Sequence, residues 1–280
     1  MYVYLNGEVK PKNQVNLSID DRGFTFGEGI YEVVRVYGGK KFLLPEHMER
    51  LKRSAAEMDI GLPEYFNYSH LEEAIDSLVE KSGLKESYLY LQVTRGVQFR
   101  SHVYQENMEP TIVMYLIGAK DWSLERQGVP ATIEEDIRWQ RCDVKSTMLM
   151  PGTLLKSRAA RKGYFEVILE RDGIITEGTS NNIFCCKDNV LITPPLSNFI
   201  LPGITREFVL RLTKQLGISV DERPIHVSEL SEMQEAFITA TGTEVIPLNK
   251  IGEYNYDAPG KLTTKIISAF DAAIKELRET

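Results

Sequence analysis

Over the first 120 positions, some segments alternate apolar and polar residues with the two-residue period of strands, and others repeat apolar residues with the longer period of helices. The stretch YVYL, the turn pair Asn6–Gly7 and the stretch EVK predict a hairpin at the start of the chain. Gly38–Gly39 is expected to turn a second hairpin over residues 31–44. This part is completed by predicted strands over 87–95 and 111–119 and by helices from Pro45 and from Ser69, where Glu72 would close a capping box.

Residues 121–130 are polar and interrupted by glycine and proline, so we expect a linker there between a domain at 1–120 and a domain at 131–280. Strands dominate the second domain, with hairpin turns predicted at Asp172–Gly173 and at 187–189. Further elements are predicted as a helix that follows LPGITRE (201–207) and ends at Gly217, a strand over 235–248 that runs into a hydroxyl-rich loop, and a C-terminal helix over 262–277. The pattern predicts the α+β class.

Composition narrows the functional classes. Charged residues make up 26% and apolar residues 42% of the chain, which is typical of soluble globular proteins. A net charge of −7 argues against a nucleic-acid partner. The N-terminus lacks a signal pattern and no apolar run reaches membrane-spanning length, so a cytoplasmic protein with no membrane contact is expected. Three cysteines and four scattered histidines show no metal-ligand spacing, and reduced core thiols are expected.

Lys145 stands at the border of an uncharged run. Ten residues without a charge follow it, among them Met148, Leu149 and Met150. Two readings are open from the pattern alone: the lysine stem packs while the ammonium reaches water, or the amine is used in its uncharged form.

Other isolated charges and possible anion sites lie in the second domain. Glu177 precedes nine uncharged residues. The stretch PGITRE (202–207) leads into a helix whose first N–H groups could hold a phosphate, with Thr205 adding a hydroxyl. TATGTE (239–244) could form a second anion nest. Ordinary capping of a helix or turn is the competing interpretation of both stretches.

In the first domain, Arg100 and His102 share one face of an extended segment and could grip a carboxylate. A solvated loop is the alternative. FGEGIYE (26–32) lacks the third glycine of a dinucleotide-binding loop, so no nicotinamide site is expected. A lysine near apolar sequence, a lone carboxylate, two possible phosphate seats and a carboxylate clamp together fit a Schiff-base enzyme with a phosphorylated aldehyde cofactor.

Longer stretches carry a family resemblance. DRGFTFGEGIYEVVRVYGG (21–39), DIRWQRCDVKS (136–146), TEGTSNN (176–182) and LPGITR (201–206) resemble, in this order, the fold-type IV pyridoxal-phosphate enzymes. This family includes branched-chain aminotransferases, D-amino acid aminotransferases and aminodeoxychorismate lyases. YLQVTRGVQFRSHVYQEN (90–107) makes the D-amino acid aminotransferases the most similar group.

The resemblance implies a two-domain architecture in which pyridoxal 5'-phosphate lies between a smaller N-terminal α/β domain and a larger strand-rich C-terminal domain. It implies that Lys145 is the catalytic Schiff-base lysine, that Glu177 pairs with the pyridine nitrogen and that Arg138 is a cation close by. The other cofactor-binding positions that it implies are Leu201 against the ring, and Arg50, Ile204, Thr205 and Thr241 around the phosphate.

It also implies that Tyr31, Arg100 and His102 trap the substrate carboxylate, with Arg100 and His102 reaching the active site of the partner in a homodimer. The expected activity is transfer of the amino group of a D-amino acid such as D-alanine to a 2-oxo acid such as 2-oxoglutarate, in a ping-pong cycle. A branched-chain L-aminotransferase, an aminodeoxychorismate lyase and a non-enzymatic binding protein with a packed Lys145 are the alternatives.

The sequence departs from the family pattern at Ala240 and Gly242, where D-amino acid aminotransferases tend to carry hydroxyl residues. Loss of one phosphate-side hydroxyl would weaken cofactor binding by about 1 kcal/mol.

Overall fold

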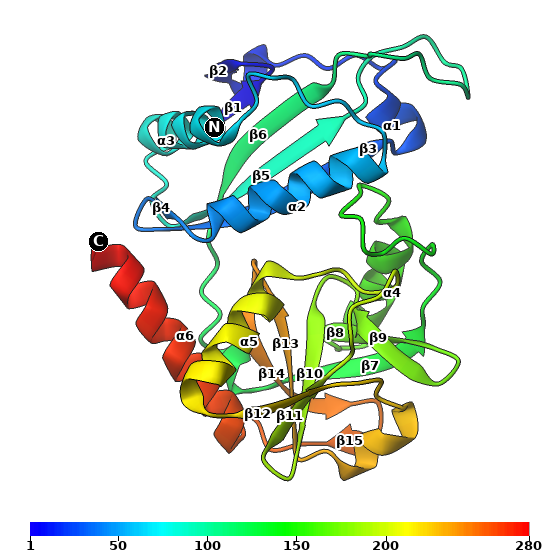
Figure 1. Ribbon diagram of the computed structural model, residues 1–280, viewed down its shortest axis with the longest axis vertical. Coiled ribbons are helices and arrows are strands. Elements are labelled where there is room, and N and C mark those ends of the chain that lie inside the picture. The colour runs from blue at the N-terminus through cyan, green and yellow to red at the C-terminus, as the bar shows by residue number, and fades with distance from the viewer. Residues whose placement is uncertain (280) are drawn as a thin grey trace. The chain divides into compact units, whose positions relative to one another are not determined.

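A computed structural model describes residues 1–279, and its internal contacts divide them into two units (Figure 1). The first unit comprises residues 1–120 and, in addition, 144–148; the second comprises 121–143 and 149–279. The short segment 144–148, which carries Lys145, therefore belongs by its contacts to the first unit although it follows the start of the predicted second domain.

The first unit is built on an antiparallel six-stranded sheet in the order β2-β1-β6-β5-β3-β4. Its strands are β1 Tyr2–Leu5, β2 Glu8–Pro11, β3 Gly29–Tyr37, β4 Lys40–Lys41, β5 Ser87–Thr94 and β6 Thr111–Gly118, and its helices are α1 Arg22–Phe26, α2 Leu44–Glu57 and α3 Tyr68–Ser82, with a 3-10 turn at Lys12–Gln14. The predicted first hairpin is confirmed, because Leu5 and Glu8 face each other across the turn.

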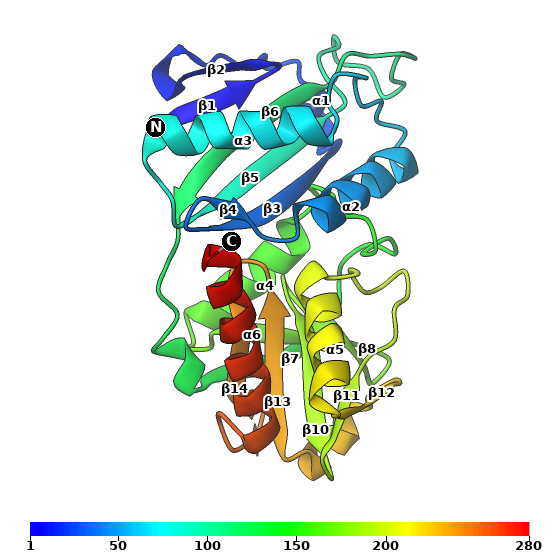
Figure 2. The ribbon, with the colours of Figure 1, turned by 60° about the vertical axis from the view of Figure 1, so that its left-hand side comes forward.

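Helices α2 and α3 cover one face of this sheet (Figure 2). Alternation along β3 therefore separates two environments: Glu32 and Val34 are buried on the covered side, whereas Tyr31 on the other side is half-buried. The ring of Tyr31 stacks on Tyr90, and Tyr90 in turn packs against Tyr115. The sheet thus presents a row of tyrosines on its less covered face.

Two details of the first unit differ from the sequence expectation. The capping box of Ser69 and Glu72 is wrong, because Asn67 is the N-cap of α3 and its side chain accepts a hydrogen bond from the His70 N–H. The strand expected over 40–44 is only two residues long, since α2 already begins at Leu44.

The second unit contains a nine-stranded mixed sheet in the order β12-β11-β10-β13-β14-β7-β8-β9, with β15 paired to β14. The β14–β7, β7–β8 and β11–β12 pairs are parallel. Its strands are β7 Val129–Glu135, β8 Glu166–Arg171, β9 Ile174–Gly178, β10 Asn182–Lys187, β11 Val190–Thr193, β12 Ser219–Glu222, β13 Glu235–Ala240, β14 Glu244–Ile251 and β15 Tyr254–Asn255; its helices are α4 Met150–Ala160, α5 Ile204–Leu216 and α6 Lys261–Glu279, with 3-10 turns at Glu125–Gln127 and Val227–Glu232.

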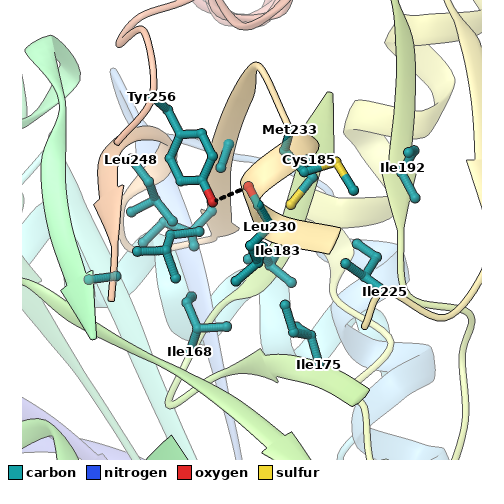
Figure 3. Close-up of a cluster of buried hydrophobic side chains, with 14 of the residues drawn as sticks. Ile168, Ile175, Ile183, Cys185, Ile192, Ile225, Leu230, Met233, Leu248 and Tyr256 are labelled. Carbon is teal, nitrogen blue, oxygen red and sulfur yellow. Dashed lines mark hydrogen bonds between the residues drawn. The ribbon is translucent and has the colours of Figure 1, made fainter. Parts of the chain in front are cut away.

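The curled sheet encloses an aliphatic core that includes Ile168, Ile183, Ile246 and Leu248 (Figure 3). Tyr256 closes it and satisfies its hydroxyl by donating to the Leu230 carbonyl at 3.0 Å. Helices α5 and α6 pack against each other and against β13. This packing holds the first turn of α5, where a phosphate seat was predicted, next to the end of β13.

One helix of the second unit was not expected. Helix α4 begins beside Pro151 and Gly152, and only Leu155 and Ala159 bury an apolar face, against β8. A helix with so narrow an apolar face leaves a weak periodic signal, and its proline and glycine resemble a loop. Strand β7 also starts at Val129, inside the predicted linker. Within residues 1–279, no helix combines the length and the apolarity needed to cross a membrane.

All three cysteines are free and buried, which generates a prediction about their reactivity. Burial raises the pKa of Cys142 to about 11, of Cys185 to about 12 and of Cys186 to about 11. The thiolate is the reactive form, and at pH 8 about one thiol in a thousand is ionised at Cys142 and Cys186 and about one in ten thousand at Cys185. We expect a disulfide reagent to leave the native protein unmodified at pH 8 and to titrate three thiols in urea. Rapid modification of the native protein would contradict this account.

Candidate active site

Lys145 is positioned by a short strand-like pairing at the edge of β3. Ser146 bridges Ile30, the Tyr31 N–H donates to the Lys145 carbonyl at 3.0 Å, and the Thr147 N–H donates to the Gly29 carbonyl at 2.9 Å. Because residues facing each other across an antiparallel pair share a face, this register places Lys145 beside Tyr31.

The Lys145 side chain lies against the tyrosine row, and its Nζ is 4.2 Å from the centroid of the Tyr31 ring. Its backbone N–H donates to the Ser54 hydroxyl of α2 at 3.2 Å. Among residues 1–279, no carboxylate forms an ion pair with this amine. The neighbouring Met148 and Met150 are 43% and 70% exposed, so most of the uncharged run after Lys145 lies on the surface, and Leu155 at its end is its one large apolar residue in a core cluster.

Arg50 is held beneath the sheet by Glu32. The guanidinium donates from Nε to Oε1 at 2.7 Å and from Nη2 to Oε2 at 2.8 Å, and His47 Nδ1 lies 2.7 Å from Oε2. Burial opposes the ionisation of Glu32, but Arg50 and His47 outweigh it and lower the pKa of the carboxyl. Burial lowers the pKa of His47, with smaller contributions from Arg50 and Lys145, although Glu32 opposes the shift. Arg50 is therefore oriented by an ionised carboxylate that also receives a hydrogen bond from His47.

In the second unit, Arg138 and Glu177 form a buried ion pair. Arg138 Nη1 donates to Glu177 Oε1 at 2.6 Å, while its Nε and Nη2 donate to Asp136 at 2.8 and 2.9 Å. Glu177 is 4% exposed. Burial raises the pKa of Glu177 to about 7, although Arg138 opposes the shift. The ionised carboxylate is thus costly at this position, and a further cation beside it would be stabilising.

Asn182 is a site residue that the sequence reasoning missed. Its amide donates to Glu177 Oε2 at 3.0 Å and to the Leu201 carbonyl at 2.9 Å, and the Leu201 N–H also donates to Glu177 Oε2, at 3.1 Å. A Cβ on Gly203 would stand 1.9 Å from the Asn182 oxygen, so only glycine fits there. The residue lies inside the TEGTSNN motif, but a strand asparagine carries no spacing signal of its own.

Helix α5 begins directly after this contact, and Ile204 and Thr205 form its first turn. Gly203 is its N-cap and provides no side-chain acceptor for the first N–H groups. Thr241 follows β13 in the tight turn to β14. Asn182 and Thr239 face each other across β10 and β13, so the turn that carries Thr241 begins two residues beyond the partner of Asn182.

Arg100 and His102 lie in the loop between β5 and β6, and both are exposed. The Phe26 ring contacts both side chains: its centroid is 5.6 Å from that of the His102 ring and 5.2 Å from the Arg100 guanidinium carbon. Both residues therefore share one aromatic neighbour, and the expectation that they act together on a carboxylate stays a prediction.

The first unit therefore gathers Tyr31, Arg50 and Lys145 around β3 and presents Arg100 and His102 on a separate loop. The second unit gathers the remaining predicted residues around the start of α5 and the ends of β9 and β13: Arg138, Glu177, Leu201, Ile204, Thr205 and Thr241.

Comparison with known proteins assigns the family. Residues 29–251 match the family described as class IV aminotransferases, and the chain belongs to this family. It is 40% identical to the D-alanine aminotransferase of Bacillus licheniformis, over 98% of this chain and 97% of that protein. It is 37% identical to the D-alanine aminotransferase of Staphylococcus epidermidis strain ATCC 35984, over 98% of each.

A solved structure has the same fold. The branched-chain aminotransferase of Thermoproteus uzoniensis with norvaline superposes with a TM-score of 0.88 at 28% identity, covering 100% of this chain and 96% of that one. The two-domain α+β architecture of fold-type IV is thereby confirmed.

The buried carboxylate beneath β3 generates a stability prediction. Glu32→Gln keeps the shape but removes the carboxylate charge that pairs with Arg50, so the free energy of unfolding should fall by about 3 kcal/mol at pH 7. Because folding lowers the pKa of Glu32, the wild-type advantage is complete above the unfolded pKa near 4.5 and is lost as the pH falls below it. Urea unfolding of both proteins between pH 7 and pH 3 measures the difference.

The exposed Glu64 offers a matched control, and Glu64→Gln should change the unfolding free energy by less than about 0.5 kcal/mol. A loss for Glu32→Gln that grows as the pH falls would contradict the ionised state of Glu32.

Proposed function

We propose that this aminotransferase is a pyridoxal 5'-phosphate enzyme that transfers the amino group of D-amino acids such as D-alanine to 2-oxo acids such as 2-oxoglutarate. The observation that carries the proposal is the 40% identity to a D-alanine aminotransferase over nearly the full length of both chains. The Arg100 and His102 pair supports it, because it offers a forked cation and an imidazole to a substrate carboxylate.

The residues fit this cofactor at both of its ends. An uncapped helix N-terminus at Gly203 offers N–H donors and a positive dipole end to a phosphate, and Thr205 supplies a hydroxyl. Glu177, whose ionised form is costly, suits a protonated pyridine nitrogen. Ile204, Thr241 and Arg50 would complete the phosphate site, and Leu201 would support the ring.

When bound, pyridoxal phosphate withdraws electrons from the bonds at the substrate Cα. The chain's own residues supply the rest of the chemistry. The amine of Lys145 would hold the cofactor aldehyde and afterwards carry the proton that leaves Cα. The position of this amine on a sheet edge, without a paired carboxylate among residues 1–279, leaves it available for both tasks.

Glu177 would keep the pyridine nitrogen protonated, and Arg138 holds the Glu177 carboxylate in one orientation. Tyr31 would contact the substrate carboxylate together with Arg100 and His102. Departure of the first oxo acid and entry of the second would give a ping-pong cycle.

We propose further that the enzyme is a cytoplasmic homodimer in which Arg100 and His102 reach the active site of the partner. The exposure of the loop that carries them supports this arrangement. Phe99 and Val103 flank the pair and are 85% and 78% exposed in the single chain. Apolar side chains with this much exposed surface are typical of a protein–protein interface.

An assay that compares a D-amino acid with an L-amino acid as amino donor tests the function. With 2-oxoglutarate as acceptor, D-alanine should be turned over with a kcat/KM about 100-fold or more above that of L-leucine. Pyruvate formation measures the first reaction and glutamate formation measures both. Lys145→Ala serves as the control and should show no turnover with either donor.

Faster turnover of L-leucine would instead assign a branched-chain aminotransferase. Release of pyruvate from aminodeoxychorismate without any 2-oxo acid would assign a lyase of the same fold.

A further inference from the structure

Arg22 is the first residue of α1 and is completely buried, at 0% exposure. A buried guanidinium needs a counter-charge, and Glu28 provides it with two hydrogen bonds, from Nε to Oε2 at 2.8 Å and from Nη2 to Oε1 at 2.5 Å. Glu28 belongs to the FGEG stretch that resembled an incomplete dinucleotide loop. The stretch thus has a role unrelated to nucleotides: it fixes a buried arginine.

The remaining donors of Arg22 point at the loop over residues 95–110. Nη1 donates to the Ser101 carbonyl at 2.6 Å, and Nη2 makes a longer contact of 3.4 Å with the His102 carbonyl. These carbonyls belong to the peptides on either side of His102, next to Arg100. The side chains of Ser101 and His102 are exposed, so the backbone of an otherwise exposed segment is attached to a buried charge.

Glu28 ties a second arginine to the same loop. Arg95, at the base of the loop, donates from Nε to Glu28 Oε2 at 2.5 Å and from its other nitrogens to the Met58 and Asp59 carbonyls at 2.7 Å. The Tyr104 ring lies 3.6 Å from the Arg95 guanidinium carbon. One carboxylate therefore holds the arginine at the base of the loop and, through Arg22, the backbone at residues 101 and 102.

Phe26, at the other end of α1, fixes the side chains that Arg22 leaves exposed. The centroid of its ring is 4.5 Å from the Arg22 guanidinium carbon, and the ring contacts the side chains of both Arg100 and His102. Helix α1 thus contacts the loop at two points. Arg22 binds the backbone carbonyls of the loop, and the Phe26 ring contacts its side chains.

We propose that Arg22, oriented by Glu28 and assisted by Phe26, is a positioning residue that sets the placement of Arg100 and His102 and thereby the recognition of the substrate carboxylate. This inference rests on the proposed function, in which Arg100 and His102 bind that carboxylate. Arg22 touches no substrate itself; it acts through the 100–102 backbone.

Arg22→Lys tests the proposal in the enzyme carrying its cofactor. Lysine keeps the charge but offers no rigid fork, so it cannot hold Glu28 and the Ser101 carbonyl together. We expect KM for D-alanine and for 2-oxoglutarate to rise about tenfold each, with kcat within about twofold of the wild type. Amide hydrogen exchange over residues 99–103 should become faster.

Arg35→Lys is the matched control. Arg35 is also buried, pairs with Glu86 and donates to the Val36 and Ser87 carbonyls, outside the loop over 95–110. Arg22→Lys and Arg35→Lys should both lower the unfolding free energy, because each weakens a buried ion pair. Arg35→Lys, however, should leave both KM values and the exchange at 99–103 at the wild-type level. Phe26→Leu introduces no buried charge and should raise both KM values severalfold, so the proposal stays testable if Arg22→Lys folds poorly.

Arg100→Ala separates this inference from the proposed function. If Arg100→Ala raises both KM values but Arg22→Lys and Phe26→Leu do not, the positioning role is overturned and the clamp stands. If Arg100→Ala leaves both KM values unchanged, the clamp itself is wrong and the positioning role falls with it. A fall in kcat alone for Arg22→Lys would likewise overturn the proposal.

Discussion

The candidate site depends on one short pairing, in which residues 144–148 add to the edge of β3. The pairing determines which face of the sheet the Lys145 amine occupies, because a slip by one residue would turn it to the opposite side. The same strand carries Tyr31 on the face of the amine and Glu32 on the covered face. Strand β3 therefore determines the position of Lys145 and, through Glu32, the orientation of Arg50, which is proposed to bind phosphate.

The buried Glu32 and Asp136 and the half-buried Glu28 each orient an arginine. In each case both oxygens receive donors and the guanidinium keeps a defined plane. An arginine that must meet a planar or tetrahedral anion gains specificity when its own plane is fixed beforehand. The burial of these pairs costs free energy, and their value lies in the orientation of Arg50, Arg22 and Arg138 more than in stability.

Most strands and the long helices could be predicted because their periodicity is local, whereas the short β12 and β15 were not predicted and the strand expected over 235–248 is the two strands β13 and β14. Helix α4 could not, since few of its side chains are buried, and α1 is too short to show a period. Lys145, Glu177 and Arg100 could be singled out by isolation or spacing, although only the family resemblance suggested their roles. Asn182 and Arg22 could not be found in this way. Each binds the backbone carbonyl of a residue distant in sequence, and such a contact leaves no pattern of residue types in the sequence.

The central claim is that Lys145 holds the cofactor, and chemical trapping tests it most directly. Borohydride reduction of the purified enzyme would make the link between the amine and pyridoxal phosphate permanent, and mass spectrometry of a digest would locate it. We predict that the modified peptide contains Lys145 and that Lys145→Ala yields no modified peptide. A pyridoxyl group on another lysine, or a colourless wild-type protein with none, would contradict the account.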